Sequence, residues 1–374
     1  MKILMITPWY PDKESPNSGA FIRSQAETLS KDHDVVVIAA KVNYRKFGLY
    51  TYHHETSQYG KVTEHRLTIY KSLPVYNQLN AWFIMLRYSR KVAREFKPDV
   101  IHASIGYPGA YWGYLLKRYT GAPYILQEHT RVKNNFRSYF HRQLTLAGLR
   151  KADALVAVGT RLATELKSLL HRDINVIPNV VEVERYRYDH RPQTTVMQIG
   201  FLGGMNTAVK GLDILLQAIA GIQKDFVLHI GGTGSKEEEY KAQAEQLGIA
   251  SKCKFYGFIP YNDIPQWMEQ LHFFVCSSRY ETFCVALVEA MASGVPVVST
   301  CCGGPEDFVN EGNGLLVENE NIAALREGIR HMMQTHQQYN PQAIAIYASD
   351  NFSRQSFLTR IEKLYHEVIE RAKR

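Results

Sequence analysis

Two glutamates eight residues apart are the side chains of this sequence that most clearly suggest chemistry. Glu281 and Glu289 lie in the segment from Ser277 to Pro296, where an apolar run, Phe273 to Cys276, leads into a loop and then an amphipathic helix. Glu281 precedes that helix and Glu289 lies within it, about 12 Å further along at ~1.5 Å per residue. Carboxylates accept paired hydrogen bonds from vicinal hydroxyls, so the spacing fits a ribose at one end and a hexose at the other.

An anion-binding site is expected between these two glutamates. The backbone N–H groups at the start of the helix have no carbonyl partner within it, and the helix dipole favours negative charge there. These N–H groups belong to Thr282, Phe283, Cys284 and Val285. Lys210 opens a second amphipathic helix, so its ammonium adds a positive charge at another helix N-terminus. The sequence therefore predicts a diphosphate site.

Apolar runs and amphipathic stretches alternate along the 374 residues, which is too long for one hydrophobic core. The runs expected to be strands are Lys2–Thr7, Asp34–Ala39, Val100–Ala103, Tyr124–Gln127, Ala154–Val158, Val196–Gly200, Val227–Gly231, Cys253–Tyr256, Phe273–Cys276 and Val295–Ser299. This alternation predicts an α/β protein with two Rossmann-like, doubly wound domains, residues 1–177 and 178–354. Ligands of such sheets bind beyond the carboxyl ends of the strands, so we expect the site in a cleft between the domains.

The chain resembles the retaining glycosyltransferases of the group 1 family, also called family 4, which have the GT-B fold. The E-x7-E pattern is followed by Ala290 to Val298 and then by Gly303 to Glu306, as in that family. Further resembling segments are Pro8–Glu27 with its Asn17-Ser18-Gly19 loop, Asp99–His102, Gln127–His129, Ala152–Ala154, Ile177–Asn179, Val209–Gly211 and Phe255–Gly257. These segments follow the order of the family and together extend over nearly the whole chain.

The resemblance implies a role for each residue of the donor site. Glu281 would contact hydroxyls of the donor sugar and Glu289 the ribose, while His129 would lie near the donor sugar and the reaction centre. Lys210 would hold the diphosphate. His129, Glu281 and Lys210 are therefore the expected catalytic groups, and no metal or cofactor is implied besides the nucleotide sugar, which is a co-substrate.

Glycine-containing loops complete the expected donor site. Gly19 follows the first strand, where a residue without a side chain lets the backbone approach a phosphate or sugar. Gly232, in the loop after the Val227 strand, would lie near the nucleotide. The loop 257–260, which contains Phe258, would offer main-chain groups to the base.

Two positions depart from the family pattern. The family usually supplies an arginine shortly after the strand that ends at Gly200, but here Phe201 to Met205 follow. We expect Arg279 to replace this arginine as the second cation for the diphosphate. Cys284 stands where the family usually has glycine, which should narrow the space around the donor without removing a backbone amide.

The acceptor side is less sharply defined. His102 at a strand end and Asn17 in the first loop are the candidate acceptor residues, although His102 could equally be structural. The polar residues from Tyr50 to His54, together with Tyr59, are expected to form a loop that borders the acceptor or is simply a surface loop. Asp32-His33-Asp34 precedes a strand and is interpreted as a turn rather than a metal site.

Charge is unevenly distributed in this protein. The net charge is +8, but residues 1–177 hold 26 Lys and Arg against 13 Asp and Glu, whereas the remainder holds 18 against 23. Two basic amphipathic segments, Asn80–Lys97 and Arg131–Lys151, could rest on an anionic membrane or be core helices with a solvated basic face. Nucleic acid is not expected, because no recognised binding motif accompanies the basic residues.

Composition and chain start set the expected location. The five cysteines include no C-x-x-C pair, and the apolar run after Met1 is too short for a signal peptide, so we expect a cytoplasmic protein that can lie at the inner face of the membrane. By resemblance, the helix 355–374 would pack back on the first domain.

The expected function is transfer of a hexosyl group, with retention, from a UDP- or GDP-sugar to a hydroxyl of an acceptor. The acceptor could be a saccharide, a lipid-linked saccharide or a small alcohol, in the synthesis of a bacterial surface polysaccharide or glycolipid. A nucleotide-sugar epimerase or hydrolase of the same fold, and a non-catalytic binder of membranes or polyanions, are the alternatives.

Overall fold

The computed structural model describes all residues except 13–17, 74–76, 137 and 190–191. The chain divides into two compact units. Unit 1 comprises Met1–Val180 together with Phe357–Arg374, and unit 2 comprises Val181–Ser356, a few residues from the boundaries given above. Among the described helices, none has a stretch long and apolar enough to cross a membrane.

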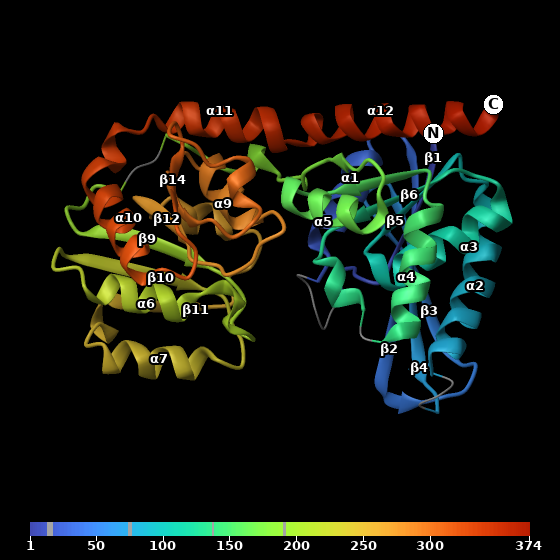
Figure 1. Cartoon of the computed structure of the whole chain (residues 1–374), viewed down its shortest axis with the longest axis horizontal. Helices are drawn as coiled ribbons and strands as arrows, with labels where there is room; N and C mark the ends of the chain where they lie inside the picture. Colours follow the sequence, from blue (N-terminus) through green and yellow to red (C-terminus); the bar gives the residue numbers. More distant parts are fainter. Residues whose placement is uncertain (13–17, 74–76, 137, 190–191) are drawn as a thin grey trace. The chain divides into compact units, whose positions relative to one another are not determined.

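Unit 1 is built on an eight-stranded sheet with the order β3-β4-β2-β1-β5-β6-β7-β8 (Figure 1). Its strands are β1 Lys2–Thr7, β2 Asp34–Phe47, β3 Tyr52–Tyr59, β4 Val62–Lys71, β5 Val100–Ser104, β6 Tyr124–Glu128, β7 Ala154–Ala157 and β8 Asn175–Val176. Its longer helices are α1 Ala20–Leu29, α2 Asn77–Phe96, α3 Tyr111–Thr120, α4 Tyr139–Lys151, α5 Thr160–Leu170 and α12 Arg354–Lys373. The central strands β1, β5 and β6 are almost wholly buried, which explains their continuous apolar runs.

Unit 2 has a six-stranded parallel sheet with the order β11-β10-β9-β12-β13-β14. The strands are β9 Met197–Leu202, β10 Phe226–Gly231, β11 Cys253–Gly257, β12 Phe273–Cys276, β13 Val297–Thr300 and β14 Gly314–Val317. The helices are α6 Leu212–Ala220, α7 Glu237–Gln246, α8 Ile264–Met268, α9 Val285–Ala292, α10 Ile322–Thr335 and α11 Pro341–Phe352. Figure 1 shows α6 and α7 on one side of this sheet and α9 on the other. The predicted α/β class with two parallel sheets is confirmed.

One part of unit 1 differs from the sequence-based expectation. The segment around Tyr52–Tyr59 is not a loop but strand β3, which pairs antiparallel with β4 as a hairpin. Seven of the eight β3 residues are exposed, so the strand lacks the alternation of apolar and polar residues that identifies a half-buried strand. The strand is held by its pairing with β4 rather than by burial of its own side chains.

The C-terminal helix α12 is part of the core of unit 1. Phe357, Ile361, Leu364 and Val368 are buried in one cluster with residues of β1, β2 and β6. Tyr365, on the same helix, is also buried, and its hydroxyl lies 2.7 Å from Nδ1 of His102 on β5. The prediction that His102 contacts the acceptor is therefore wrong: the side chain is fully buried beneath α12, and burial lowers its pKa to about 4.

Replacement of Tyr365 by phenylalanine tests this buried contact. The change leaves the His102 ring buried without its hydroxyl partner, which should cost about 1–3 kcal/mol of unfolding free energy. At about 2–4 °C per kcal/mol for a unit of this size, the melting temperature should fall by roughly 2–12 °C. Tyr119→Phe, which removes an exposed hydroxyl, is the matched control. Equal melting temperatures for the two variants would show that the contact adds no stability.

Candidate functional site

The Lys210 side chain is presented by a short turn at the carboxyl end of β9. The turn η4, Ala208–Lys210, is capped by the Thr207 hydroxyl, which accepts a hydrogen bond from the Val209 N–H. Gly211 ends the turn with a φ of 68°, and α6 begins at the next residue. A Cβ atom at Gly211 would lie 1.8 Å from the carbonyl oxygen of Ser277, so only glycine allows this approach. The turn is thereby packed directly against the loop that follows β12.

That loop holds the turn through several hydrogen bonds. The Ser277 hydroxyl donates to the Lys210 carbonyl at 3.2 Å, and the Arg279 N–H donates to the Val209 carbonyl at 2.8 Å. The Arg279 guanidinium also donates to the Ala208 carbonyl. Backbone and side chain of the β12 loop together fix the position of Lys210.

The structure corrects the role expected for Arg279. Its guanidinium forms a bidentate ion pair with Asp213 at 2.9 and 2.7 Å, and its Nε lies 3.2 Å from Glu320. These carboxylates occupy the donors that a phosphate would need, so Arg279 positions the Lys210 turn and is not a replacement for the missing phosphate arginine. The sequence could not show this, because Asp213 looked like an ordinary residue of the first turn of a helix.

Lys210 and Glu281, predicted separately, meet in the structure. Lys210 Nζ lies 2.7 Å from Glu281 Oε1, and the Ser278 hydroxyl donates to the same oxygen at 2.7 Å. Burial alone would lower the pKa of Lys210, but the Glu281 carboxylate outweighs it and raises that pKa. The ammonium is thus charged at neutral pH. Glu281 is 8% exposed and Lys210 is about a third exposed, so a ligand can reach the pair from one side.

The N-terminus of α9 lies directly after this ion pair in the chain. Cys284, at the N-cap position, has a φ of 80°. Residues other than glycine rarely adopt this left-handed backbone conformation. The Cys284 sulfur lies 3.7 Å from that of buried Cys276. These two sulfurs and a Glu281 oxygen lie within 4.8 Å of one another, and Glu281 also pairs with the Lys210 ammonium.

The residues of the predicted diphosphate site, Thr282 to Val285, differ in whether the side chain or only the backbone can face a ligand. Phe283 is buried, and its ring packs against those of Phe308 and Phe352 at 5.6 and 5.5 Å. Its side chain therefore anchors the loop, and only its backbone can face a ligand. Val285 begins α9, where the first N–H groups have no carbonyl partner within the helix. Thr282 precedes them in the same loop.

Glu289 lies inside α9 and is only 4% exposed. Burial raises its pKa to about 7, while interactions with Tyr186 and Arg185 oppose that shift. Arg185 in turn stacks on Tyr261, with its guanidinium carbon 4.1 Å from the ring centroid. Sequence reasoning missed these three neighbours, because Arg185, Tyr186 and Tyr261 are distant from Glu289 in the chain.

Two further predicted donor residues lie at the carboxyl ends of neighbouring strands. Gly232 follows β10, and its N–H donates to the Gly257 carbonyl at the end of β11 at 2.7 Å. Phe258 follows Gly257 and is 48% exposed. Since β11, β10, β9 and β12 are neighbours in the sheet, these loops occupy the same edge as Lys210 and Glu281.

In unit 1, His129 follows β6 and is almost fully buried. Its Nδ1 lies 3.0 Å from Oδ1 of Asn179, and its ring lies 4.5 Å from that of Phe21. Burial and the nearby His102 lower its pKa to about 3, so the ring is neutral. With the Asn179 oxygen as acceptor, Nδ1 carries the hydrogen and Nε2 remains the basic atom. The sequence analysis named Asn179 only within the resembling segment Ile177–Asn179 and gave it no role in the site.

Glu128 was not predicted as a site residue, yet it organises the loops around His129. Its carboxylate accepts hydrogen bonds from the N–H groups of Gly106, His129 and Thr130 and from the Thr130 hydroxyl. Burial raises the pKa of this carboxyl, and these hydrogen bonds act in the opposite direction. Gly19, the N-cap residue of α1, has a φ of 70°, and a Cβ there would lie 2.6 Å from the Trp9 backbone. Asn17 lies outside the described residues.

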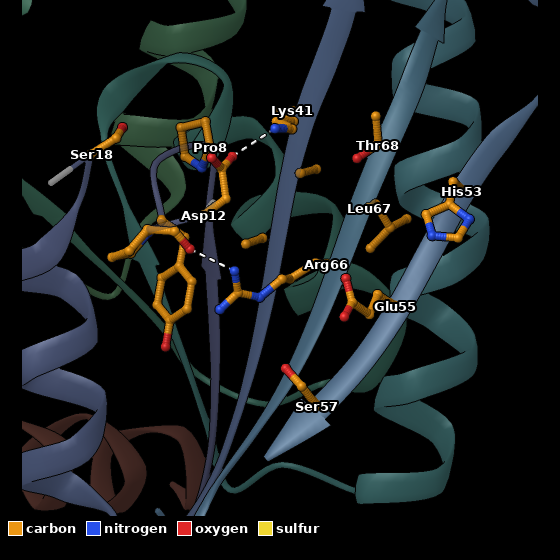
Figure 2. A pocket seen from close by; sticks show the side chains of 14 residues that line it. Pro8, Asp12, Ser18, Lys41, His53, Glu55, Ser57, Arg66, Leu67 and Thr68 are labelled. Atoms are coloured by element: carbon orange, nitrogen blue, oxygen red, sulfur yellow. Dashed lines mark hydrogen bonds and ion pairs between the residues drawn. The ribbon is translucent and has the colours of Figure 1, made fainter. Parts of the chain in front are cut away.

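Unit 1 also contains a cavity of about 540 Å³ beside the β3–β4 hairpin. Its lining is mixed, and Figure 2 shows the polar side chains in it: Lys41 pairs with Asp12 at 2.7 Å, and Arg66 donates to the Pro11 carbonyl at 2.6 Å. His53 and Glu55 extend from β3 into the same region. Hydroxyl-rich molecules suit such a lining, because it offers both donors and acceptors of hydrogen bonds.

Comparison with known proteins agrees with this geometry. Residues 19–185 match the model of "Glycosyltransferase Family 4", and residues 183–348 match that of "Glycosyl transferases group 1". An uncharacterized glycosyltransferase of Methanocaldococcus jannaschii is 28% identical over 78% of this chain and 81% of its own. The putative teichuronic acid biosynthesis glycosyltransferase TuaC of Bacillus subtilis is 24% identical over 88% of each chain.

A solved structure shows the same fold. HepE of Anabaena, in complex with UDP, superposes with a TM-score of 0.75 over 98% of this chain and 100% of that chain, at 19% identity. Three findings lead to one assignment. Two family models together match residues 19–348, similar proteins are glycosyltransferases, and each unit contains an α/β sheet of mostly parallel strands. The chain belongs to the group 1 glycosyltransferases, family 4, and has the GT-B fold.

Proposed function

We propose that this glycosyltransferase moves a hexosyl group from a nucleotide diphosphate sugar to an acceptor hydroxyl, with retention of configuration and without a metal ion. The observation that carries the proposal is the Lys210–Glu281 ion pair at the N-terminus of α9. A UDP- or GDP-sugar supplies the diphosphate for the cation and the sugar hydroxyls for the carboxylate. HepE was solved with UDP, which supports a nucleotide donor for this chain.

In this mechanism the ion pair opens when the donor binds. The Lys210 ammonium turns from Glu281 to the diphosphate, and Glu281 accepts hydrogen bonds from sugar hydroxyls. As the bond between the anomeric carbon and the phosphate oxygen breaks, Lys210 and the α9 N–H groups stabilise the charge on the leaving diphosphate. The acceptor oxygen bonds to the same carbon, and its proton passes to the leaving phosphate.

Unit 1 supplies the acceptor side in this proposal. His129 is neutral, so it acts through hydrogen bonds near the sugar rather than as a cation. The cavity beside the β3–β4 hairpin receives the acceptor, because its lining suits a polyhydroxylated molecule. The proposed role is in surface polysaccharide or glycolipid synthesis at the inner face of the cell membrane. The name of TuaC, which gives teichuronic acid biosynthesis, supports the polysaccharide part of this proposal.

The donor proposal predicts a selective thermal shift. A nucleotide at one hundred times its Kd stabilises the protein by about 2.7 kcal/mol, or roughly 5–11 °C for a unit of this size. We expect such a shift from one of UDP, GDP or ADP, or its sugar conjugate, in metal-free buffer, and its loss in Lys210→Ala. Lys224→Ala, which removes an exposed lysine of the same unit at the amino end of β10, is the control.

Lys210→Ala leaves the Glu281 carboxylate without its partner, so the double variant Lys210→Ala/Glu281→Gln is measured beside it. No shift with any nucleotide, or an equal shift in wild type and both variants, contradicts the donor site. Product analysis without an acceptor separates the reaction classes: intact donor is expected, whereas rapid hydrolysis or an epimerised sugar would favour the other enzymes of this fold.

Glu289 predicts how donor binding depends on pH. A carboxyl with a pKa of about 7 must lose its proton before it can accept two hydrogen bonds from the ribose. The nucleotide Kd should therefore be about tenfold higher at pH 6 than at pH 8, because protonation competes with binding below the pKa. Isothermal titration calorimetry measures this ratio.

Glu289→Gln is the control for that measurement. It should bind more weakly at pH 8 and lose the part of the pH dependence that belongs to the protein. Ionisation of the nucleotide's own phosphate is common to both proteins, so the difference between them isolates Glu289. Parallel pH profiles for wild type and Glu289→Gln would exclude ribose binding by this carboxylate.

A further inference from the structure

One end of unit 1 exposes an unusual number of large apolar side chains. They come from the end of β2 and the following turn, from the residue pair after β4, and from the first turns of α2 and α4. Each is between 45% and 77% exposed. This apolar patch consists of Phe47, Leu49, Tyr50, Leu73, Leu79, Phe83, Tyr139 and Phe140. Contiguous exposed apolar residues on a folded protein commonly mark an interaction surface.

Side-chain contacts join the elements that carry the patch. The rings of Tyr50 and Phe83 lie 5.6 Å apart, and the Tyr50 N–H donates to Asn80 at 2.7 Å. Trp82, next to Phe83 on α2, lies 5.4 Å from Phe140 on α4. Figure 1 shows the ends of β2, α2 and α4 at the same end of unit 1. These contacts bring the turn after β2, the start of α2 and the start of α4 together at this end of unit 1.

The chain segments that carry the patch are rich in basic residues. The segments 35–54, 65–94 and 129–152 contain 15 Lys and Arg and no Asp or Glu, while an acidic residue borders each end of them: Asp34, Glu55, Glu64, Glu95, Glu128 and Asp153. Along the exposed face of α2, Leu79 and Phe83 come first and Arg87 and Arg90 follow. An apolar end backed by cations matches a bilayer, whose acyl region accepts the apolar side chains while anionic headgroups pair with the arginines.

The acceptor cavity lies close to the same end of unit 1. Strand β2 carries Lys41 in the cavity lining and Phe47 in the patch, six residues further along. At ~3.3 Å per residue these positions are at most about 20 Å apart. A saccharide attached to a membrane lipid through a diphosphate or a short glycan could extend from the bilayer to the cavity over such a distance.

We infer that the apolar patch docks unit 1 on an anionic bilayer, and that the acceptor is a lipid-linked saccharide rather than a soluble alcohol. The choice of acceptor rests on the proposed function, whereas the docking does not. The side chains that insert are the aromatic and aliphatic members of the patch, and the arginines of α2 and α4 contact the headgroups.

Vesicle flotation of the full chain tests the docking. Wild type should float with vesicles of phosphatidylcholine containing about 30% phosphatidylglycerol, and much less with phosphatidylcholine alone. Phe83→Ser/Tyr139→Ser should weaken this binding by about tenfold or more, and Arg87→Gln/Arg142→Gln should weaken it most at low salt. Leu316→Ser/Ile346→Ser, which removes exposed apolar residues of unit 2, is the matched control and should float like wild type.

Several results would overturn the docking: no flotation of wild type, equal flotation with neutral vesicles, or equal loss in the patch variant and the unit 2 control. Light scattering tests whether a second copy of the chain, rather than a bilayer, occupies the patch. A dimer that Phe83→Ser/Tyr139→Ser converts to monomers, without vesicle binding by wild type, would assign the patch to a second copy. The nucleotide-induced thermal shift, measured on each variant, verifies that it is folded.

The acceptor class has its own readout. The protein is incubated with membranes and with a nucleotide sugar that carries a label in its sugar. The label should move into material that chloroform and methanol extract. Label found only in small water-soluble products overturns the lipid-linked acceptor. If the protein binds vesicles but no nucleotide, the proposed function fails while the docking stands. If it binds a nucleotide but no vesicles, the docking fails while the proposed function stands.

Discussion

The ion pair between Lys210 and Glu281 is the interaction on which the site in unit 2 depends. Taking an ammonium and a carboxylate out of water is unfavourable unless each has a partner in good geometry. The turn before α6 and the loop after β12 provide that geometry through the Ser277 and Arg279 contacts, while Ser278 donates to the carboxylate. The pair thus holds both groups in place until a ligand supplies better partners.

Much of this arrangement could be predicted from local sequence. Strands buried on both faces have continuous apolar runs, so all ten expected strands coincide with or overlap observed ones. The E-x7-E spacing correctly placed Glu281 before a helix and Glu289 within it. The contact between Lys210 and Glu281 could not be predicted from spacing alone. It exists because β9 and β12 are neighbours in the sheet, so loops 71 residues apart meet at one edge.

The errors have physical reasons of the same kind. Strand β3 is stabilised by hydrogen bonds to β4 while its side chains face solvent, so no apolar pattern reveals it. His102 looked accessible at the end of an apolar run, but helix α12, which is more than 250 residues away in sequence, covers it. Arg279 looked available for phosphate because its partner Asp213 is distant in the chain. In each case a nonlocal partner decided the outcome.

The membership of α12 in unit 1 has a consequence for the order of events during synthesis. The first 180 residues leave the ribosome with a hydrophobic face that their own chain cannot cover, and all of unit 2 must be made before Phe357 and the following residues emerge. At ~5–20 residues per second this interval lasts on the order of ten seconds or more. During that time Ile3, Val37 and Ile125 lack their final neighbours. Unit 2, whose segment is continuous, can complete its own core first, so the unit that begins the chain is the last to become complete.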